Sequence, residues 1–216
     1  MSSSNYKWGT DTQDGKPMKV VLFVSRNKDN KEVIDYKERR ESFVTTKDWE
    51  DLIPDFERFK NNGVAGEMSR MYISVNARNN ATVHKELLHF LIDNPDFNLA
   101  HLPSKIAGIA AKKECALEKK WMFDFDIDAE LAVDAFCDDI NAITNPKEAV
   151  AEEIEFIIPH TINLVEKVVR TPHGYAVITT RGFDTRELFK KWSPEEVTLK
   201  RDDLLCVAWG KKEEIL

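Results

Sequence analysis

The chain has few cysteines and no run of apolar residues long enough to span a membrane. Its three cysteines, Cys115, Cys137 and Cys206, are isolated, and no C-x-x-C pair occurs. Neither a disulfide framework nor a cysteine-based zinc site is therefore expected. Residues 1–16 are polar and lack the apolar region of a signal peptide. These absences favour a cytoplasmic protein that has no membrane partner.

Sequence motifs of two large enzyme classes are also missing. The chain has no Gly-rich phosphate loop of the Walker type, which argues against a P-loop nucleotide hydrolase. It has no G-x-S-x-G segment, which argues against a serine hydrolase. Its formal net charge is −7, so the surface as a whole is unsuited to a polyanion. Binding of a nucleic acid would need a local basic patch or bridging metal ions.

The residues that are present indicate a folded α+β protein. Hydrophobic residues make up 42% and aromatic residues 10% of the 216 residues, which is enough for one well-buried core. Strand-like and helix-like segments interleave without the regular alternation of a parallel α/β fold. We expect a mixed or antiparallel central sheet flanked by helices. Residues 1–16 are expected to form a flexible tail, and residues 17–216 a single α+β domain.

The expected elements follow from apolar periodicity and from turn and cap residues. Strands are expected at residues 19–25, 33–36, 70–76, 120–128, 163–170, 175–180, 197–199 and 204–209. Helices are expected at residues 46–61, 82–93, 103–119, 128–141, 146–156 and 184–191. Pro54 would kink or split the first of these helices.

Residues 120–128 alternate apolar and acidic side chains at the spacing of a β-strand. Successive side chains of a strand point to opposite faces, so the carboxylates of Asp124, Asp126 and Asp128 would share the face opposite the core. Neighbouring carboxylates repel one another unless a cation lies between them. Mg²⁺ or Mn²⁺ bound by Asp124 and Asp126 would supply that cation, since hard divalent ions take carboxylates together with substrate phosphates.

Two structural explanations of the same acids stay open. An edge strand with a solvated acidic face would carry this pattern without binding a metal ion. Asp128 is also well placed to cap the helix expected after it, because Asp is favoured at that position.

A second polar feature is the turn Thr171-Pro172-His173-Gly174 between two β-branched segments. Pro presets φ and Gly permits positive φ, so this segment is expected to be the turn of a hairpin. Thr171 and the backbone N–H groups near Gly174 could form an anion-binding nest. Arg181, after the second strand, could neutralise a triphosphate or a nucleic-acid backbone. Without a ligand, His173 is an exposed turn residue and Arg181 an ordinary surface charge.

Phe123-Asp124-Phe125-Asp126 and the turn at residues 171–176 together resemble two motifs of the archaeo-eukaryotic primase superfamily, including its small phage-encoded members. The resemblance extends over residues 70–209. It implies a primase-polymerase fold in which Asp124 and Asp126 are catalytic and bind Mg²⁺ or Mn²⁺. It also implies that Thr171, His173 and Gly174 contact the phosphates of a nucleoside triphosphate, that nucleic acid is a partner, and that the protein acts in a cytoplasm, that of the host if a phage encodes it.

The chain departs from the family pattern at two positions. Ala176 stands where the family has a His, and Thr198 where a third acid is expected, while Asp202 and Asp203 follow four and five residues later. Two-metal catalysis needs two ions that clamp the attacking and leaving oxygens. Two hypotheses follow. One is a metal-dependent nucleotidyltransferase that acts on nucleotides or nucleic acid. The other is a catalytically degenerate module of the same fold that binds nucleic acid or a basic protein.

Overall fold

The computed structural model describes residues 17–144 and 163–213. These residues contain eight strands and five α-helices, which confirms the α+β class. All strand pairs are antiparallel, and they form two four-stranded sheets where a single central sheet was expected. Within the described residues, no helix combines the length and the apolar composition needed to cross a membrane.

The chain divides into two compact units, and the second is inserted into the first. The first unit runs up to Glu118 and resumes at Asp202, whereas Lys119–Arg201 forms the second. The single domain expected at residues 17–216 stays a prediction, because compactness alone does not say whether the units fold independently. The tail expected at residues 1–16 lies outside the described residues.

The first unit is built on a sheet with the strand order β2-β1-β3-β8. Its strands are β1 (Lys19–Ser25), β2 (Arg39–Thr45), β3 (Met68–Ser74) and β8 (Leu204–Lys211). Strand β2 therefore lies at an edge of this sheet. Strand β1 has the predicted bounds, and its Val and Phe side chains are buried on both faces, while Leu22 is half-buried.

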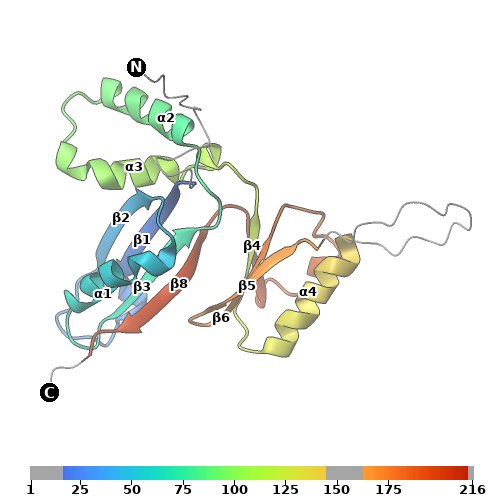
Figure 1. Cartoon of the computed structure of the whole chain (residues 1–216). Helices are drawn as coiled ribbons and strands as arrows, with labels where there is room; N and C mark the ends of the chain where they lie inside the picture. Colours follow the sequence, from blue (N-terminus) through green and yellow to red (C-terminus); the bar gives the residue numbers. More distant parts are fainter. Residues whose placement is uncertain (1–16, 145–162, 214–216) are drawn as a thin grey trace, which may run out of the picture. The chain divides into compact units, whose positions relative to one another are not determined.

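Helices cover both faces of this first sheet. Figure 1 shows α1 (Ile53–Asn61) in front of the sheet, where Phe56 packs with Phe23 of β1. Helices α2 (Asn80–Asp93) and α3 (Leu102–Ala110) contribute to a separate apolar cluster that contains Val20. Because Val20 and Phe23 point to opposite faces of β1, α1 and α3 lie on opposite faces of the sheet.

Several predicted elements of the first unit have different bounds in the structure. The strand expected at 33–36 is wrong: these residues form a turn in which Asp35 has a φ of 57°, and the second strand begins at Arg39. The helix expected from residue 46 begins at Ile53, because Pro54 fits only the first turn of a helix. Helix α3 ends at Ala110 instead of residue 119. The helix expected at 146–156 lies outside the described residues.

The buried carboxylate of Glu67 makes the stability of the first unit depend on pH. Only 1% of Glu67 is exposed, and its Oε1 accepts hydrogen bonds from Nε and Nη2 of Arg39 at 3.0 and 2.5 Å. Its Oε2 accepts the N–H of Val64 at 2.9 Å. Burial by itself raises the pKa of Glu67, but these hydrogen bonds outweigh it and hold the pKa below its ordinary value of 4.5.

We expect the substitution Glu67→Gln to flatten the acid side of the stability profile. A carboxyl whose pKa is lower in the folded protein stabilises the fold above the unfolded pKa, and this contribution is lost as the pH falls through the folded pKa. Below the ordinary value of 4.5, the free energy of unfolding should therefore fall more steeply for the wild type than for the variant. Urea denaturation from neutral to acid pH measures both slopes, and equal slopes would contradict the assignment.

The second unit follows the β-α-β-β-α-β order of a ferredoxin-like fold. Its elements are β4 (Trp121–Phe125), α4 (Glu130–Thr144), β5 (Val165–Thr171), β6 (Gly174–Thr179), α5 (Leu188–Lys191) and β7 (Val197–Lys200). The strand order β5-β6-β4-β7 places β4 in the interior of the sheet. The explanation by a solvated face assumed that the acidic segment lies on an edge strand. Strand β4 is an interior strand, so this assumption is wrong.

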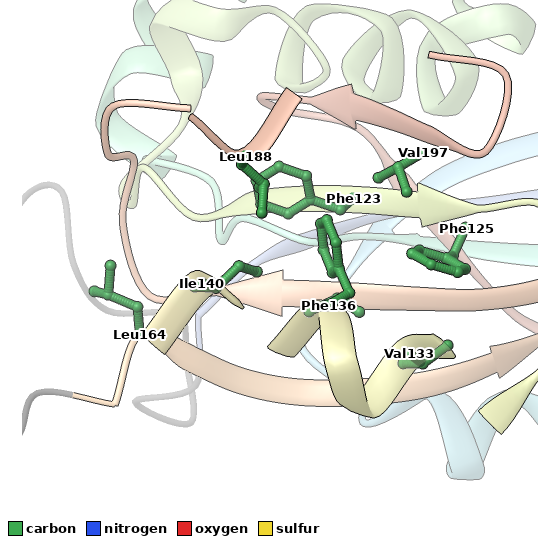
Figure 2. Packing of buried hydrophobic residues seen from close by; sticks show 9 residues of the cluster. Phe123, Phe125, Val133, Phe136, Ile140, Leu164, Leu188 and Val197 are labelled. Atoms are coloured by element: carbon green, nitrogen blue, oxygen red, sulfur yellow. The ribbon is translucent and has the colours of Figure 1, made fainter. Parts of the chain in front are cut away.

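The core of the second unit lies between this sheet and α4. Phe123 and Phe125 of β4 are fully buried, and each ring centroid lies 5.3 Å from that of Phe136 on α4. Figure 2 shows the ring of Phe136 rising from the helix toward Phe123. Because Phe123 and Phe125 face α4, the alternate residues Met122 and Asp124 point to the face that α4 does not cover.

Candidate functional site

Asp124 lies on the interior strand β4, on the face of the second sheet that is opposite α4. It is paired across the sheet with Ala176 of β6 and with Thr198 of β7. Its Oδ2 accepts a hydrogen bond from Nζ of Lys200 at 2.8 Å. Lys200 is two residues beyond Thr198 on β7, which makes it the diagonal neighbour of Asp124.

Lys200 supplies a positive charge beside the acidic strand, and sequence reasoning missed it. The side chains of Lys200 and Asp124 are 34% and 29% exposed, so solvent screens their attraction and the pair adds at most about 1 kcal/mol to stability. The pair therefore breaks at little cost when a ligand competes for either charge. The alternation of side chains along the strand could have identified Lys200. It places Lys200 on the same face of the sheet as Thr198, the partner of Asp124.

Asp126 lies just beyond the end of β4. The strand predicted to continue to residue 128 ends at Phe125, although the N–H of Asp126 still bonds to the carbonyl oxygen of Glu196 at 3.1 Å. The side chain of Asp126 is exposed. Only Asp124 of the three acids lies within the strand itself.

Asp128 is committed to Arg170 and does not cap a helix. Its two carboxylate oxygens accept hydrogen bonds from Nη1 and Nη2 of Arg170 at 2.5 and 2.8 Å. Helix α4 begins at Glu130, so the prediction that Asp128 caps it is wrong. The carboxylate of Asp128 instead forms a bidentate pair with Arg170, which lies 42 residues later in the sequence.

The predicted hairpin is confirmed, but Gly174 is the first residue of β6 and does not have the positive φ expected of a turn glycine. Thr171 of β5 pairs with Gly174 of β6, so Pro172 and His173 form the turn. A Cβ atom on Gly174 would overlap the carbonyl oxygen of Phe125 and lie 3.0 and 3.1 Å from O and N of Ile127. The chain segments on both sides of Asp126 are thus in contact with the start of β6.

The other predicted phosphate-binding residues are placed differently. Thr171 is 8% exposed at the end of β5, whereas His173 is exposed on the turn. Arg181 is exposed and follows the opposite end of β6, where Thr179 pairs with Trp121. At about 3.3 Å per residue, the length of β6 separates Arg181 from the turn by roughly 17 Å. The structure therefore places the start of β6 beside the chain around Asp126, and Arg181 beyond the other end of the strand.

The two acids that follow Thr198 have partners of their own. Asp202 belongs to the first unit, where its carboxylate binds Nη1 and Nη2 of Arg78 at 2.8 and 3.0 Å. It also accepts a hydrogen bond from Nδ2 of Asn76 at 3.1 Å. Asp203 accepts the N–H of Leu204 at 2.7 Å. Asp202 is therefore already neutralised by a buried arginine.

The donor set suits a metal ion that arrives with a phosphate ligand better than an ion held by protein alone. Among residues 17–144 and 163–213, no group of three or more His, Cys, Asp or Glu side chains is placed to hold an ion. Two neighbouring carboxylates are nevertheless sufficient for Mg²⁺, which takes one or two of them and completes its shell with substrate phosphates and water. Asp124 on β4 and Asp126 just beyond its end are residues of the required type.

Comparisons with known proteins found no relative of this chain. No protein-family model matches the chain, and no curated protein and no solved structure matches it either.

Proposed function

We propose that the second unit binds the Mg²⁺ or Mn²⁺ complex of a nucleoside triphosphate and acts in nucleotidyl transfer to nucleic acid. The observation that carries the proposal is the contact of Gly174, the first residue of β6 after the turn, with the chain on both sides of Asp126, next to Asp124. A carboxylate pair and a Gly-containing turn at one end of a sheet combine metal ligands with backbone N–H donors for phosphate.

Each residue then has a defined task. Asp124 and Asp126 would hold the metal ion, which supplies charge stabilisation on the phosphate oxygens as the new bond to a 3′-hydroxyl forms. Lys200 would leave Asp124 and donate to a phosphate oxygen, because its partly exposed ion pair is weakened by solvent and a phosphate carries more negative charge. Backbone N–H groups of the turn would orient the remaining phosphates.

A second candidate function is a non-catalytic module of the same fold that binds nucleic acid or a basic protein. The specific observation in its favour is the Asp124–Lys200 ion pair, in which the ammonium group of Lys200 lies beside the carboxylate where a metal ion would bind. Thr198 and Ala176 face Asp124 from the two adjacent strands, where an acid and a His would assist catalysis in the family that the motifs resemble.

Thermal unfolding with and without a nucleoside triphosphate and Mg²⁺ or Mn²⁺ tests the site. A ligand at a hundred times its Kd adds about 2.7 kcal/mol, which for a chain of this size raises the Tm by roughly 5–10 °C. We expect this shift in the wild type and its loss in the double variant Asp124→Asn, Asp126→Asn. The control is Asp138→Asn, an exposed carboxylate on α4 on the opposite face of the sheet, which should keep the full shift.

Extension of a labelled primer by the same preparations separates the two candidate functions. Metal-dependent extension that is lost in the double variant is expected of a nucleotidyltransferase. A stable, nucleotide-binding protein without extension activity would identify the non-catalytic module. The absence of any metal-dependent Tm shift in the wild type would overturn the nucleotide site itself.

A further inference from the structure

The first unit contains a groove that the proposed function does not use. It has a volume of about 600 Å³ and lies between strands β1 and β2 and helix α3. Its floor is apolar and includes Val20, Leu22, Ala107 and Leu204. The volume falls within the range of roughly 300–1,000 Å³ that is typical of pockets for small organic ligands.

Arg40 is the charged residue of β2 that shares the groove face of the sheet. Leu22 pairs with Ser42 and Val24 with Arg40, so Ser42 and Arg40 share the α3 face of the sheet with Val20 and Leu22. Glu41 also borders the groove, but it is paired with Phe23, which belongs to the cluster on the α1 face. By strand alternation, the side chain of Glu41 therefore points to the face of the sheet opposite the groove.

Arg40 is a charged donor at the rim of the groove, and its side chain is exposed. Within the part of the chain that the structure describes, the guanidinium of Arg40 forms no hydrogen bond and no ion pair. The hydroxyl of Ser104 at the same rim is already used, because it donates to the carbonyl oxygen of His101 at 2.9 Å. Arginine matches carboxylate and phosphate groups, which it binds through two parallel hydrogen bonds.

Gly108 leaves the backbone of α3 open to the groove. It lies inside α3 and lines the groove, and a Cβ atom built on it would meet nothing within 4 Å. Glycine inside a helix costs roughly 0.5–1 kcal/mol relative to alanine, and packing within the chain does not require it here. Close approach of a ligand to the helix backbone is a use of glycine that accounts for this cost.

We propose that this groove binds a small organic anion with an apolar, ring-sized body and one carboxylate or phosphate group. The body lies on the apolar floor against Gly108, and the anionic group pairs with Arg40. The proposal concerns the first unit alone and is independent of the nucleotide site, which lies in the second.

Two fluorescent dyes with similar aromatic bodies test the proposal on the full chain. The anionic dye is 8-anilinonaphthalene-1-sulfonate, and the neutral dye is N-phenyl-1-naphthylamine. Arg40→Ala should weaken binding of the anionic dye by at least about tenfold and leave the neutral dye unaffected, because a charge-assisted hydrogen bond is lost. Gly108→Phe should weaken binding of both dyes by filling the groove, and the open space above Gly108 allows this variant to fold.

Two controls are matched to these variants. Gly108→Ala adds only a methyl group and should bind both dyes, and Arg58→Ala removes an exposed arginine of α1 on the opposite face of the sheet. Competition of the anionic dye by 1-naphthoate or by 1-naphthyl phosphate assigns the anion as a carboxylate or a phosphate. Unchanged dye binding in Gly108→Phe, equal effects of Arg40→Ala on both dyes, or competition by neither anion would overturn the proposal.

Discussion

Replacement of Gly174 by alanine is expected to lower the free energy of unfolding by about 3 kcal/mol, the upper end of the usual range for overpacking. The added Cβ would overlap the carbonyl oxygen of Phe125 and press on the backbone of Ile127. Backbone atoms of an interior strand cannot rotate away as the end of a side chain can. Strand β6 must therefore move away from β4, and several pairs of the ladder between them weaken.

Urea denaturation followed by tryptophan fluorescence measures this change, because Trp192 packs against Phe125 with ring centroids 5.4 Å apart. Gly108→Ala is the matched control: the same substitution inside α3 meets no atom within 4 Å and should be neutral or stabilise by up to about 1 kcal/mol. The Gly174→Ala variant should also lose the metal-dependent Tm shift, since the turn moves away from Asp126. Wild-type stability of Gly174→Ala would contradict the close contact of the hairpin with β4.

Truncation of Phe136 to alanine is expected to destabilise the protein by about 3–5 kcal/mol, the range for a fully buried aromatic residue. Phe136 has no exposed surface, and its ring centroid lies 5.3 Å from those of Phe123, Phe125 and Trp192. Its removal leaves a cavity at the centre of the contact between α4 and β4 (Figure 2). The edge-on ring contacts with all three partners are lost at the same time.

Leu131→Ala is the control for this prediction, because Leu131 lies on the same helix but is 84% exposed. Its effect should stay within about 0.5 kcal/mol. Near-ultraviolet circular dichroism should lose intensity in Phe136→Ala and not in Leu131→Ala, since Trp192 loses a fixed aromatic neighbour. Similar stabilities of the two variants would show that α4 does not pack on β4 through Phe136.

Local patterns in the sequence predicted the elements with strong apolar periodicity. Strand β1 and the β5–β6 hairpin were identified because a run of β-branched residues, or a Pro and a Gly at a turn, determines backbone conformation over a few residues. Strand β2 was missed, since its first three residues, from Arg39 to Glu41, are charged. Charged side chains are common on edge strands, where they discourage pairing with another chain, and they conceal the alternation that identifies a strand.

These local patterns could not predict the partners of the candidate site residues. Asp124 and Asp126 were chosen from their spacing. The structure places Asp124 within β4 and Asp126 just beyond its end. The cation beside Asp124 is Lys200, 76 residues later, and the partner of Asp128 is Arg170, 42 residues later. Such neighbours depend on strand order and register, which the pairing of β4 with β6 and β7 establishes.

By itself, the sequence determined the α+β class, the inward face of β4 and the position of the Gly174 turn, because each of these depends on residues within a few positions of one another. Only the tertiary structure decided that there are two sheets, that β4 is an interior strand, and that a lysine and the hairpin turn lie beside the acidic pair. The physical reason is that side-chain periodicity is local, whereas the free energy that brings distant strands together comes from burial of apolar side chains between the sheets and the helices that cover them.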